Sequence, residues 1–231
     1  SNEKSENLRQ IREYNPDDAR GYERYLKASE ARHKVGFDLL DKPFSTLAQL
    51  MRFAPDLVRL RGDQSVYTLV SKYIKNEQLR QAVSFHPLLI GGNPFTASSL
   101  YSLISHLEVT GGVWSAMGGT GRIVEAMGNL IKGQGTDIRV NTEVDQITTA
   151  DGKVTGVRLK SGEHIAANLV ISNADSAWTY KHLLSETVKR KWTERRIDKA
   201  HYSNGLFVWY FGTKKQYPDI PHHSIILGPR Y

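Results

Sequence analysis

The sequence predicts a mixed α/β fold in which a helical part precedes a part that alternates helices with strands. Up to about residue 110, apolar residues recur at helical spacing behind helix-start signals. From Gly111 onward, short apolar runs are separated by Asp151-Gly152 and Ser161-Gly162, which are typical hairpin turns. A further strand-bearing stretch begins near residue 200. We therefore expect two spatial domains between which the chain passes more than once.

The first part begins with a clear helix start at Asn15-Pro16-Asp17-Asp18, where Asn15 can cap and the acids favour the positive end of the helix dipole. Further helices are expected after these capping residues: Ser45 or Thr46, Ser65, Asn76, and Ser98 or Ser99. Pro55 is expected to kink or end the second of them. The apolar loop from Phe85 to Phe95 contains two prolines and a Gly-Gly pair, which argue against regular structure.

The second part opens with Gly118-Gly119-Thr120-Gly121, which leads into a helix that ends at Gly133 and Gly135. A helix is also expected behind Asn173-Ala174-Asp175, and a basic helical stretch over 188–199. The expected strands are 137–141, 144–149, 154–159, 164–166, 169–172, 203–212 and 224–227.

Composition excludes several classes of function. The 231 residues are 39% hydrophobic and 24% charged, which is an ordinary globular balance, and the net charge of +7 favours an anionic partner or surface. The absence of cysteine excludes disulfides, thiolate metal sites and thiol catalysis. The histidines are scattered, so no metal site is expected. No apolar run reaches membrane-spanning length. Because the chain starts at Ser1 and stops after an apolar strand-like stretch, we expect a piece of a longer chain.

Three local patterns leave alternatives open. The Gly118–Gly121 turn could cradle a phosphate at a helix start, but it lacks the lysine of a P-loop and the third glycine of a dinucleotide fingerprint. The basic stretch Lys189–Lys199, which contains Trp192, fits a solvated helix face, a membrane-surface helix or a nucleic-acid site. The apolar, arginine-flanked cluster within 37–61 fits helix core or an entry surface for a lipid-phase substrate.

A colinear series of motifs resembles the bacterial-type phytoene desaturases, which are carotenoid desaturases of the flavin amine-oxidase-like superfamily. The longest block is Ser84-Phe85-His86-Pro87-Leu88-Leu89-Ile90-Gly91-Gly92-Asn93-Pro94-Phe95. Further blocks follow in the same order: Gly112-Val113-Trp114, Gly118-Gly119-Thr120-Gly121, Asn141-Thr142-Glu143-Val144, Val170-Ile171-Ser172-Asn173-Ala174-Asp175, Tyr210-Phe211-Gly212 and Gly228-Pro229-Arg230-Tyr231. The resemblance covers most of the chain.

The resemblance implies an FAD enzyme that desaturates phytoene toward lycopene and lies as a peripheral protein on the cytoplasmic side of a membrane. Its implied fold is a Rossmann-like FAD domain interleaved with a helical and mixed-sheet substrate domain. Residues 1–110 would form the helical, membrane-associating substrate lobe and 111–185 the middle of the FAD domain. Residues 186–231 would return to the substrate domain as a basic helix followed by strands. The family's glycine-rich diphosphate site and its C-terminal flavin-contacting segment have no counterpart here, so the isolated chain is expected to be inactive.

The resemblance also implies site residues. Val144 would contact the adenine through its main chain, and Gly118 and Gly119 would enter the helix beside the cofactor. Arg52 is the catalytic candidate, and Gln49 stands where relatives can carry an acid. The substrate-lining candidates are Gln49, His86, Asn93 and Phe95. The expected partners are a lipophilic polyene and a membrane surface, and no nucleic acid. Two alternatives stay open: a non-catalytic membrane-surface or nucleic-acid-binding module, and a flavin oxidoreductase on another isoprenoid lipid, such as a C30 carotenoid or a retinoid.

Overall fold

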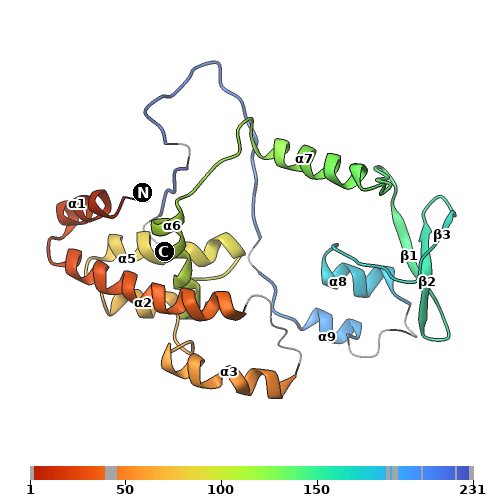
Figure 1. Ribbon diagram of the computed structural model, residues 1–231, viewed down its shortest axis with the longest axis horizontal. Coiled ribbons are helices and arrows are strands. Elements are labelled where there is room, and N and C mark those ends of the chain that lie inside the picture. Colours follow the sequence, from red (N-terminus) through yellow and green to blue (C-terminus); the bar gives the residue numbers. More distant parts are fainter. Residues whose placement is uncertain are drawn as a thin grey trace. The chain divides into compact units, whose positions relative to one another are not determined.

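The computed structural model describes residues 3–39, 46–185, 188, 192–203, 205–221 and 223–228 (Figure 1). The chain divides into two compact units, each described by itself below. The first unit comprises residues 1–114 together with 203–231, and the second comprises 115–202. Their assignment to a substrate domain and a cofactor domain stays a prediction.

The first unit is helical, as expected. Its elements are α1 (Lys4–Tyr14), α2 (Asp18–Leu39), α3 (Leu47–Arg59), α4 (Val66–Ser71), α5 (Glu77–Ser84), the 3₁₀ helices η1 (His86–Ile90) and η2 (Ser99–Ser102), and α6 (Leu103–Gly111). The side chains of four predicted capping residues accept hydrogen bonds from the backbone at helix starts: Thr46, Ser65, Asn76 and Ser98. None of the helices in the described ranges is long and apolar enough to span a membrane.

Two local expectations for this unit are wrong. Pro55 does not end α3, which continues to Arg59, because the proline removes one backbone donor while the capping box at Thr46 and the remaining bonds persist. The apolar loop is also not wholly irregular. His86–Ile90 forms the 3₁₀ helix η1, since Pro87 sits in its first turn, where no intrahelical donor is required. Gly91, with φ of 69°, ends η1 in the left-handed region.

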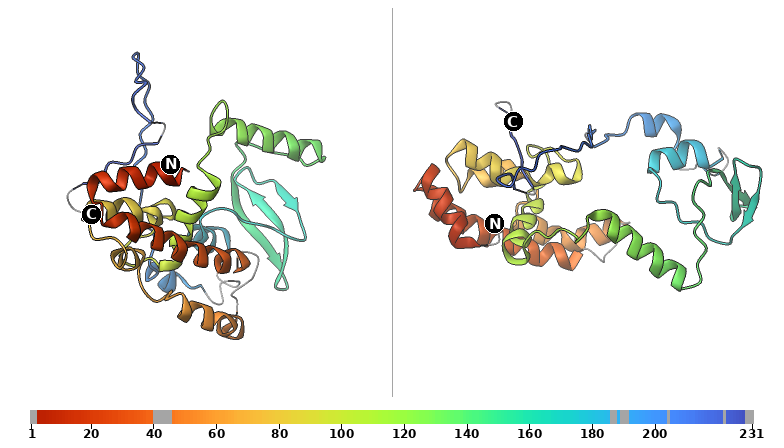
Figure 2. Two further views of the ribbon diagram at one scale, coloured as in Figure 1. Left: turned by 60° about the vertical axis from the view of Figure 1, so that its left-hand side comes forward. Right: turned by 90° about the horizontal axis from the view of Figure 1, so that it is seen from above.

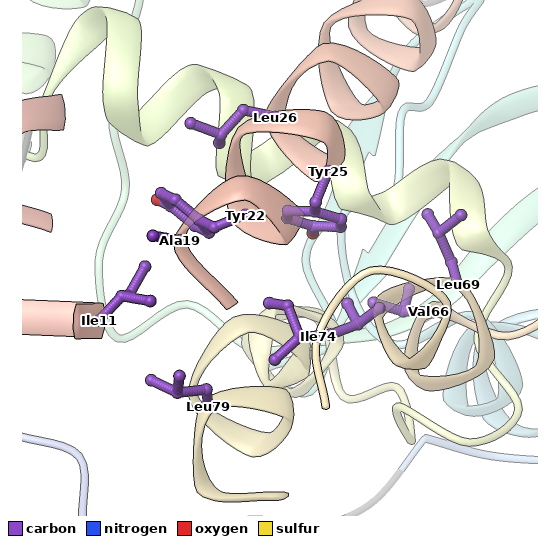
Figure 3. Close-up of a cluster of buried hydrophobic side chains, with 10 residues drawn as sticks. Ile11, Ala19, Tyr22, Tyr25, Leu26, Val66, Leu69, Ile74 and Leu79 are labelled. Atoms are coloured by element: carbon purple, nitrogen blue, oxygen red, sulfur yellow. The ribbon is translucent and has the colours of Figure 1, made fainter. Parts of the chain in front are cut away.

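The core of the first unit lies between α2 and the α4–α5 segment. Figure 3 shows its side chains gathered there, and α1 contributes Ile11. Four of these side chains are almost fully buried: Tyr25, Val66, Val70 and Ile74. Burial of each of the three aliphatic ones contributes about 1.5–3 kcal/mol to the stability of the fold. The helices approach closely at one point. A Cβ on Gly21 of α2 would lie 1.9 Å from the Tyr73 carbonyl oxygen, so only glycine fits there.

Two buried charged side chains fasten the ends of helices to this core. The Asp18 carboxylate accepts hydrogen bonds from the backbone N–H groups of Lys75 and Asn76, at 2.7 and 2.8 Å, and so ties the start of α2 to the link between α4 and α5. Arg32 of α2 donates to the carbonyl oxygen of Leu60, which closes α3, at 2.6 Å. Burial lowers the pKa of the Arg32 guanidinium. Arg32 therefore sets the position of the end of α3.

Among its described residues, the second unit contains the helix α7, a small three-stranded sheet and three short helical segments. Its elements are α7 (Thr120–Gly133), β1 (Val144–Ala150), β2 (Lys153–Leu159), β3 (His164–Ala166), α8 (Ser176–Trp178), the π-helical turn η3 (Thr179–Leu183) and α9 (Glu194–Asp198). The strands form an antiparallel sheet in the order β1-β2-β3, which Figure 2 shows side by side. The predicted hairpins and the helix start at Asp175 are confirmed.

Several predicted strands are absent from the described residues: 137–141, 169–172, 203–212 and 224–227. In the described part of 186–231, α9 forms a short helix within the expected basic stretch, whereas the strands expected after it are absent. The physical reason is pairing, since a strand exists only where a neighbour satisfies its backbone groups. These segments are apolar but solvent-facing, and Phe207 is 93% exposed. Residues 189–191, which belong to the predicted basic stretch, lie outside the described residues. The assignment of 186–231 to the substrate domain stays a prediction.

Candidate functional site

The first unit contains an open cleft of about 840 Å³ between α1, α5 and α6, with residues 112–114 at one side. Its size falls within the range of small-molecule sites. Apolar and aromatic side chains from Ile11, Tyr14, Leu79, Val83, Val109 and Trp114 line the cleft together with polar ones such as Asn7, Gln10 and Gln78.

Helical periodicity explains how the sequence builds this cleft. From α1 it is lined by Asn7, Gln10, Ile11 and Tyr14, which follow the i, i+3, i+4, i+7 spacing of one helix face. The same periodicity in α5 presents Gln78, Leu79, Ala82 and Val83, and in α6 Ser105, Glu108 and Val109. Trp114 is held by its indole N–H, which donates to the Gly111 carbonyl oxygen at 2.6 Å. Three helices thus each turn one face toward the same space.

A buried histidine lies at the polar side of the cleft. The His86 side chain is 4% exposed, and its Nε2 lies 2.8 Å from Oε2 of Glu108, whose side chain is 34% exposed. The other ring nitrogen, Nδ1, lies 3.1 Å from the Val83 carbonyl oxygen and 3.5 Å from Oγ of Ser105. His86 therefore joins η1 to α5 and α6.

Both ring nitrogens of His86 have polar partners. The Val83 carbonyl oxygen near Nδ1 and the Glu108 carboxylate oxygen near Nε2 are acceptors, whereas Oγ of Ser105 can donate or accept. These contacts fix the orientation of the imidazole ring at the cleft wall.

Two tyrosines extend this polar group into the core. The Tyr25 hydroxyl and Oγ of Ser105 are hydrogen-bonded at 2.9 Å, and burial raises the pKa of Tyr25 to about 12. Burial also raises the pKa of Tyr22, which lines the cleft, and the nearby Glu108 carboxylate raises it further. Both phenols thus stay protonated at neutral pH and act as neutral hydrogen-bonding groups.

Only one of the predicted substrate-lining residues, His86, lies in this cleft. Asn93 accepts a hydrogen bond from the Phe95 backbone N–H at 2.8 Å, and the Phe95 ring packs on Tyr67, with ring centroids 4.6 Å apart. Gln49 accepts from the Thr46 backbone N–H at 3.0 Å in the capping box of α3, and Arg52 is exposed on the same helix. The structure therefore does not bring these four residues together with His86 at the cleft, and their roles stay predictions.

The predicted cofactor-binding residues belong to the second unit. Gly118 and Gly119, with φ of 81° and 88°, form the turn before α7, and Val144 is the first residue of β1. A Cβ on Gly119 would meet no atom within 4 Å, so its backbone faces open space. Among the residues described in this structure, no three metal-ligating side chains gather.

Sequence reasoning missed the partner residues of His86. Glu108 could have been singled out, because it is the one acidic residue in the helix Leu103–Gly111. Ser105 and Tyr25 carry no such signal. Their contact joins residues 80 positions apart and follows from the packing of α2 against α6.

Comparison with known proteins gives consistent matches along the chain. Residues 5–222 match the family of flavin-containing amine oxidoreductases. The chain is 46% identical to the neurosporene-forming phytoene desaturase of Cereibacter sphaeroides, over 96% of this chain and 44% of that protein. It is 42% identical to the lycopene-forming phytoene desaturase of Pseudescherichia vulneris, over 100% of this chain and 47% of that protein.

A more distant relative is the 4,4'-diapophytoene desaturase of a Methylomonas species, 29% identical over 91% of this chain and 42% of that protein. The chain thus spans less than half the length of these relatives. The resemblance drawn from the motifs is confirmed by these matches. The chain belongs to the flavin-containing amine oxidoreductase family.

Proposed function

We propose that this chain supplies about half of an FAD-dependent phytoene desaturase, an enzyme of carotenoid biosynthesis. The observation that carries the proposal is identity of 40–46% to five phytoene desaturases over at least 96% of the chain.

The proposed cofactor is FAD, and backbone groups of the second unit are the proposed contacts for it. Gly118 and Gly119 would allow a close approach, because no Cβ covers this turn, and Val144 would contact the adenine from the start of β1. In this proposal the second unit belongs to a Rossmann-like FAD domain, and the helical unit belongs to the substrate domain. When bound, the flavin accepts the hydride that leaves the substrate carbon.

This chain's own part in the reaction is to bind and orient the polyene and to hold charge beside it. Each desaturation would break two C–H bonds on neighbouring carbons and form one double bond, with the hydride passing to the flavin and the proton released to water. Arg52 is the candidate for an electrostatic role here, and its guanidinium would stabilise negative charge that develops beside the substrate. The low polarity of such a site strengthens these electrostatic interactions.

The proposed location is a membrane surface, reached as a peripheral protein from the cytoplasmic side. The support is an apolar stripe on α3, formed by Leu47, Met51 and Val58, which are 62–73% exposed. Arg52 lies on the same helix, and the net charge of +7 suits anionic head groups. A lipophilic substrate would then enter from the bilayer.

The test uses full-length protein, FAD and liposomes that contain phytoene. We expect the visible absorbance of conjugated carotenoids to rise with time, with products separated by chromatography. The matched variants are Arg52→Lys, which keeps the charge, and Arg52→Gln, which removes it. Loss of turnover in Arg52→Gln but not Arg52→Lys supports the charge role of Arg52. A full-length protein that binds no flavin and leaves phytoene unchanged contradicts the proposal.

A further inference from the structure

A second cleft of the helical unit is rich in cationic side chains. This cationic cleft of about 980 Å³ is open to solvent and is lined from α1, from α2 and from the link between α4 and α5. Ten residues line it, of which about one would be lysine or arginine at the chain's average of 31 in 231. Five of the ten are cationic: Lys4, Arg20, Arg24, Lys27 and Lys75. By contrast, none of the described residues that line the cleft around His86 is a lysine or an arginine.

The acidic side chains of the cationic cleft do not balance these charges. Three are present, which leaves an excess of two positive charges: Asp17, Asp18 and Glu23. Asp18 is 1% exposed and accepts hydrogen bonds from two backbone N–H groups, so it is turned away from solvent. Glu23 pairs with Lys4 at 2.9 Å. The hydrogen bond and charge of Lys4 lower the pKa of Glu23, and the charge of Lys27 lowers it further, as expected in a positive surrounding.

The other four cations have no acidic partner among the described residues. Arg20, Arg24, Lys27 and Lys75 are exposed, and none of them takes part in an ion pair between described residues. Lysine and arginine side chains are charged throughout the neutral range, so this excess does not depend on a titration. A concave surface lined by one sign of charge concentrates the opposite charge.

The walls of the cationic cleft are held in place by the core. Arg20, Arg24 and Lys27 follow the i, i+4, i+7 spacing of one face of α2, and their backbone positions span about 10 Å at 1.5 Å per residue. The backbone N–H of Lys75 is held by Asp18 at 2.7 Å, and the close contact of Gly21 with Tyr73 fixes α2 against the same link. A ligand would therefore meet cations whose backbone is already ordered, which lowers the cost of binding.

We propose that the cationic cleft binds a small soluble molecule that carries two or more linked phosphate groups, such as a diphosphate ester. Guanidinium groups match phosphate oxygens in pairs, and lysine adds a compact charge. The row of cations on α2 is longer than a single phosphate group, which favours linked phosphates. Its place in a cleft favours a compact solute over a flat bilayer surface. The inference goes beyond the proposed function, because it assigns a second anion site to the helical unit.

The first test measures binding of inorganic pyrophosphate and of inorganic phosphate by calorimetry, without divalent cations. The full-length protein is loaded with FAD, so that pyrophosphate cannot bind at the flavin site. We expect pyrophosphate to bind at least about tenfold more tightly than phosphate, because its second phosphate group reaches further cations of the row. The affinity should fall as the salt concentration rises. Absent pyrophosphate binding, or equal affinity for both anions, overturns the proposal.

A pair of matched double variants locates the site. Arg24→Gln with Lys27→Gln removes two cations of the cleft, whereas Arg195→Gln with Lys153→Gln removes the same two residue types at exposed positions outside it. With helix content by circular dichroism unchanged, only the first pair should weaken pyrophosphate binding, by at least about tenfold. An equal loss in both pairs attributes the binding to net charge alone and overturns the proposal.

Vesicles distinguish a soluble ligand from a lipid head group. Sedimentation with phosphatidylcholine vesicles is compared with and without phosphatidylglycerol, for wild type and for the Arg24→Gln, Lys27→Gln variant. We expect this variant to lose pyrophosphate binding and to keep the vesicle binding of wild type. Loss of binding to the anionic vesicles, with no pyrophosphate binding in wild type, assigns the cations to a membrane lipid and overturns the proposal. Phytoene turnover tests the proposed function separately, so the two proposals can fail independently.

Discussion

Replacing Gly21 by alanine should strongly destabilise the helical unit, and the geometry allows the effect to be estimated. The added Cβ would lie 1.9 Å from the Tyr73 carbonyl oxygen, whereas real Cβ contacts essentially never fall below 3.0 Å. The backbone of α2 must therefore move about 1 Å away from the end of α4. Neither side can yield easily, because Ile74 is buried next to Tyr73 and Asp18 binds the two following backbone N–H groups.

The expected cost follows from two contributions. Overpacking of a tight core costs about 1–3 kcal/mol, and weakening the hydrogen bonds of Asp18 adds about 1 kcal/mol. We expect a loss of about 3 kcal/mol in the free energy of unfolding, which is a large part of the usual 5–15 kcal/mol. The control is Gly128→Ala on α7, where a Cβ meets no atom within 4 Å and alanine should instead stabilise by about 0.5–1 kcal/mol.

Urea unfolding monitored by circular dichroism measures both variants. At a slope of about 2 kcal/mol per molar urea, Gly21→Ala should lower the midpoint by about 1.5 M, while Gly128→Ala should leave it equal or higher. If Gly21→Ala changes stability by less than about 0.5 kcal/mol, or behaves like Gly128→Ala, the close packing of α2 on Tyr73 is refuted.

Three further predictions concern ionisable groups of the helical unit. Asp18→Ala should lower the free energy of unfolding in urea by about 2–4 kcal/mol, because two backbone N–H groups lose their acceptor. An unchanged free energy of unfolding would show that these two hydrogen bonds do not hold α2 to the α4–α5 link. Desolvation, and then the neighbouring His33, lowers the pKa of His106 below its ordinary 6.5, so the free energy of unfolding should fall as pH drops below about 6.5. A wild-type urea midpoint that stays constant below pH 6.5, or that falls equally in His106→Gln, would argue against this. Burial raises the pKa of Tyr25 to about 12, so stability should be full below pH 10 and fall as pH rises above it, and phenolate absorbance should reveal one late-titrating tyrosine.

The local signals in the sequence predicted the helical unit well because they act within a few residues. Thr46, Ser65 and Asn76 cap helices by hydrogen bonds to backbone groups three positions away, so their effect is visible in the sequence. The two hairpins of the second unit follow from their turns in the same way.

Features that depend on distant partners could not be predicted in this way. Segments such as 203–212 have strand composition but lack a paired neighbour in the described structure. The His86–Glu108 contact joins residues 22 positions apart. The resemblance named His86 as a substrate-lining residue, which stays a prediction, and its contact with Glu108 follows only from the tertiary fold.

Reduction of the flavin by substrate is the readout closest to the proposed desaturation. Phytoene in liposomes would be added anaerobically to the full-length, FAD-loaded protein. We expect the visible absorbance of oxidised flavin to decrease in proportion to the phytoene converted, because each double bond formed would transfer one hydride to the flavin. Unchanged flavin absorbance together with unchanged phytoene, in protein that has bound FAD, would contradict the proposed function.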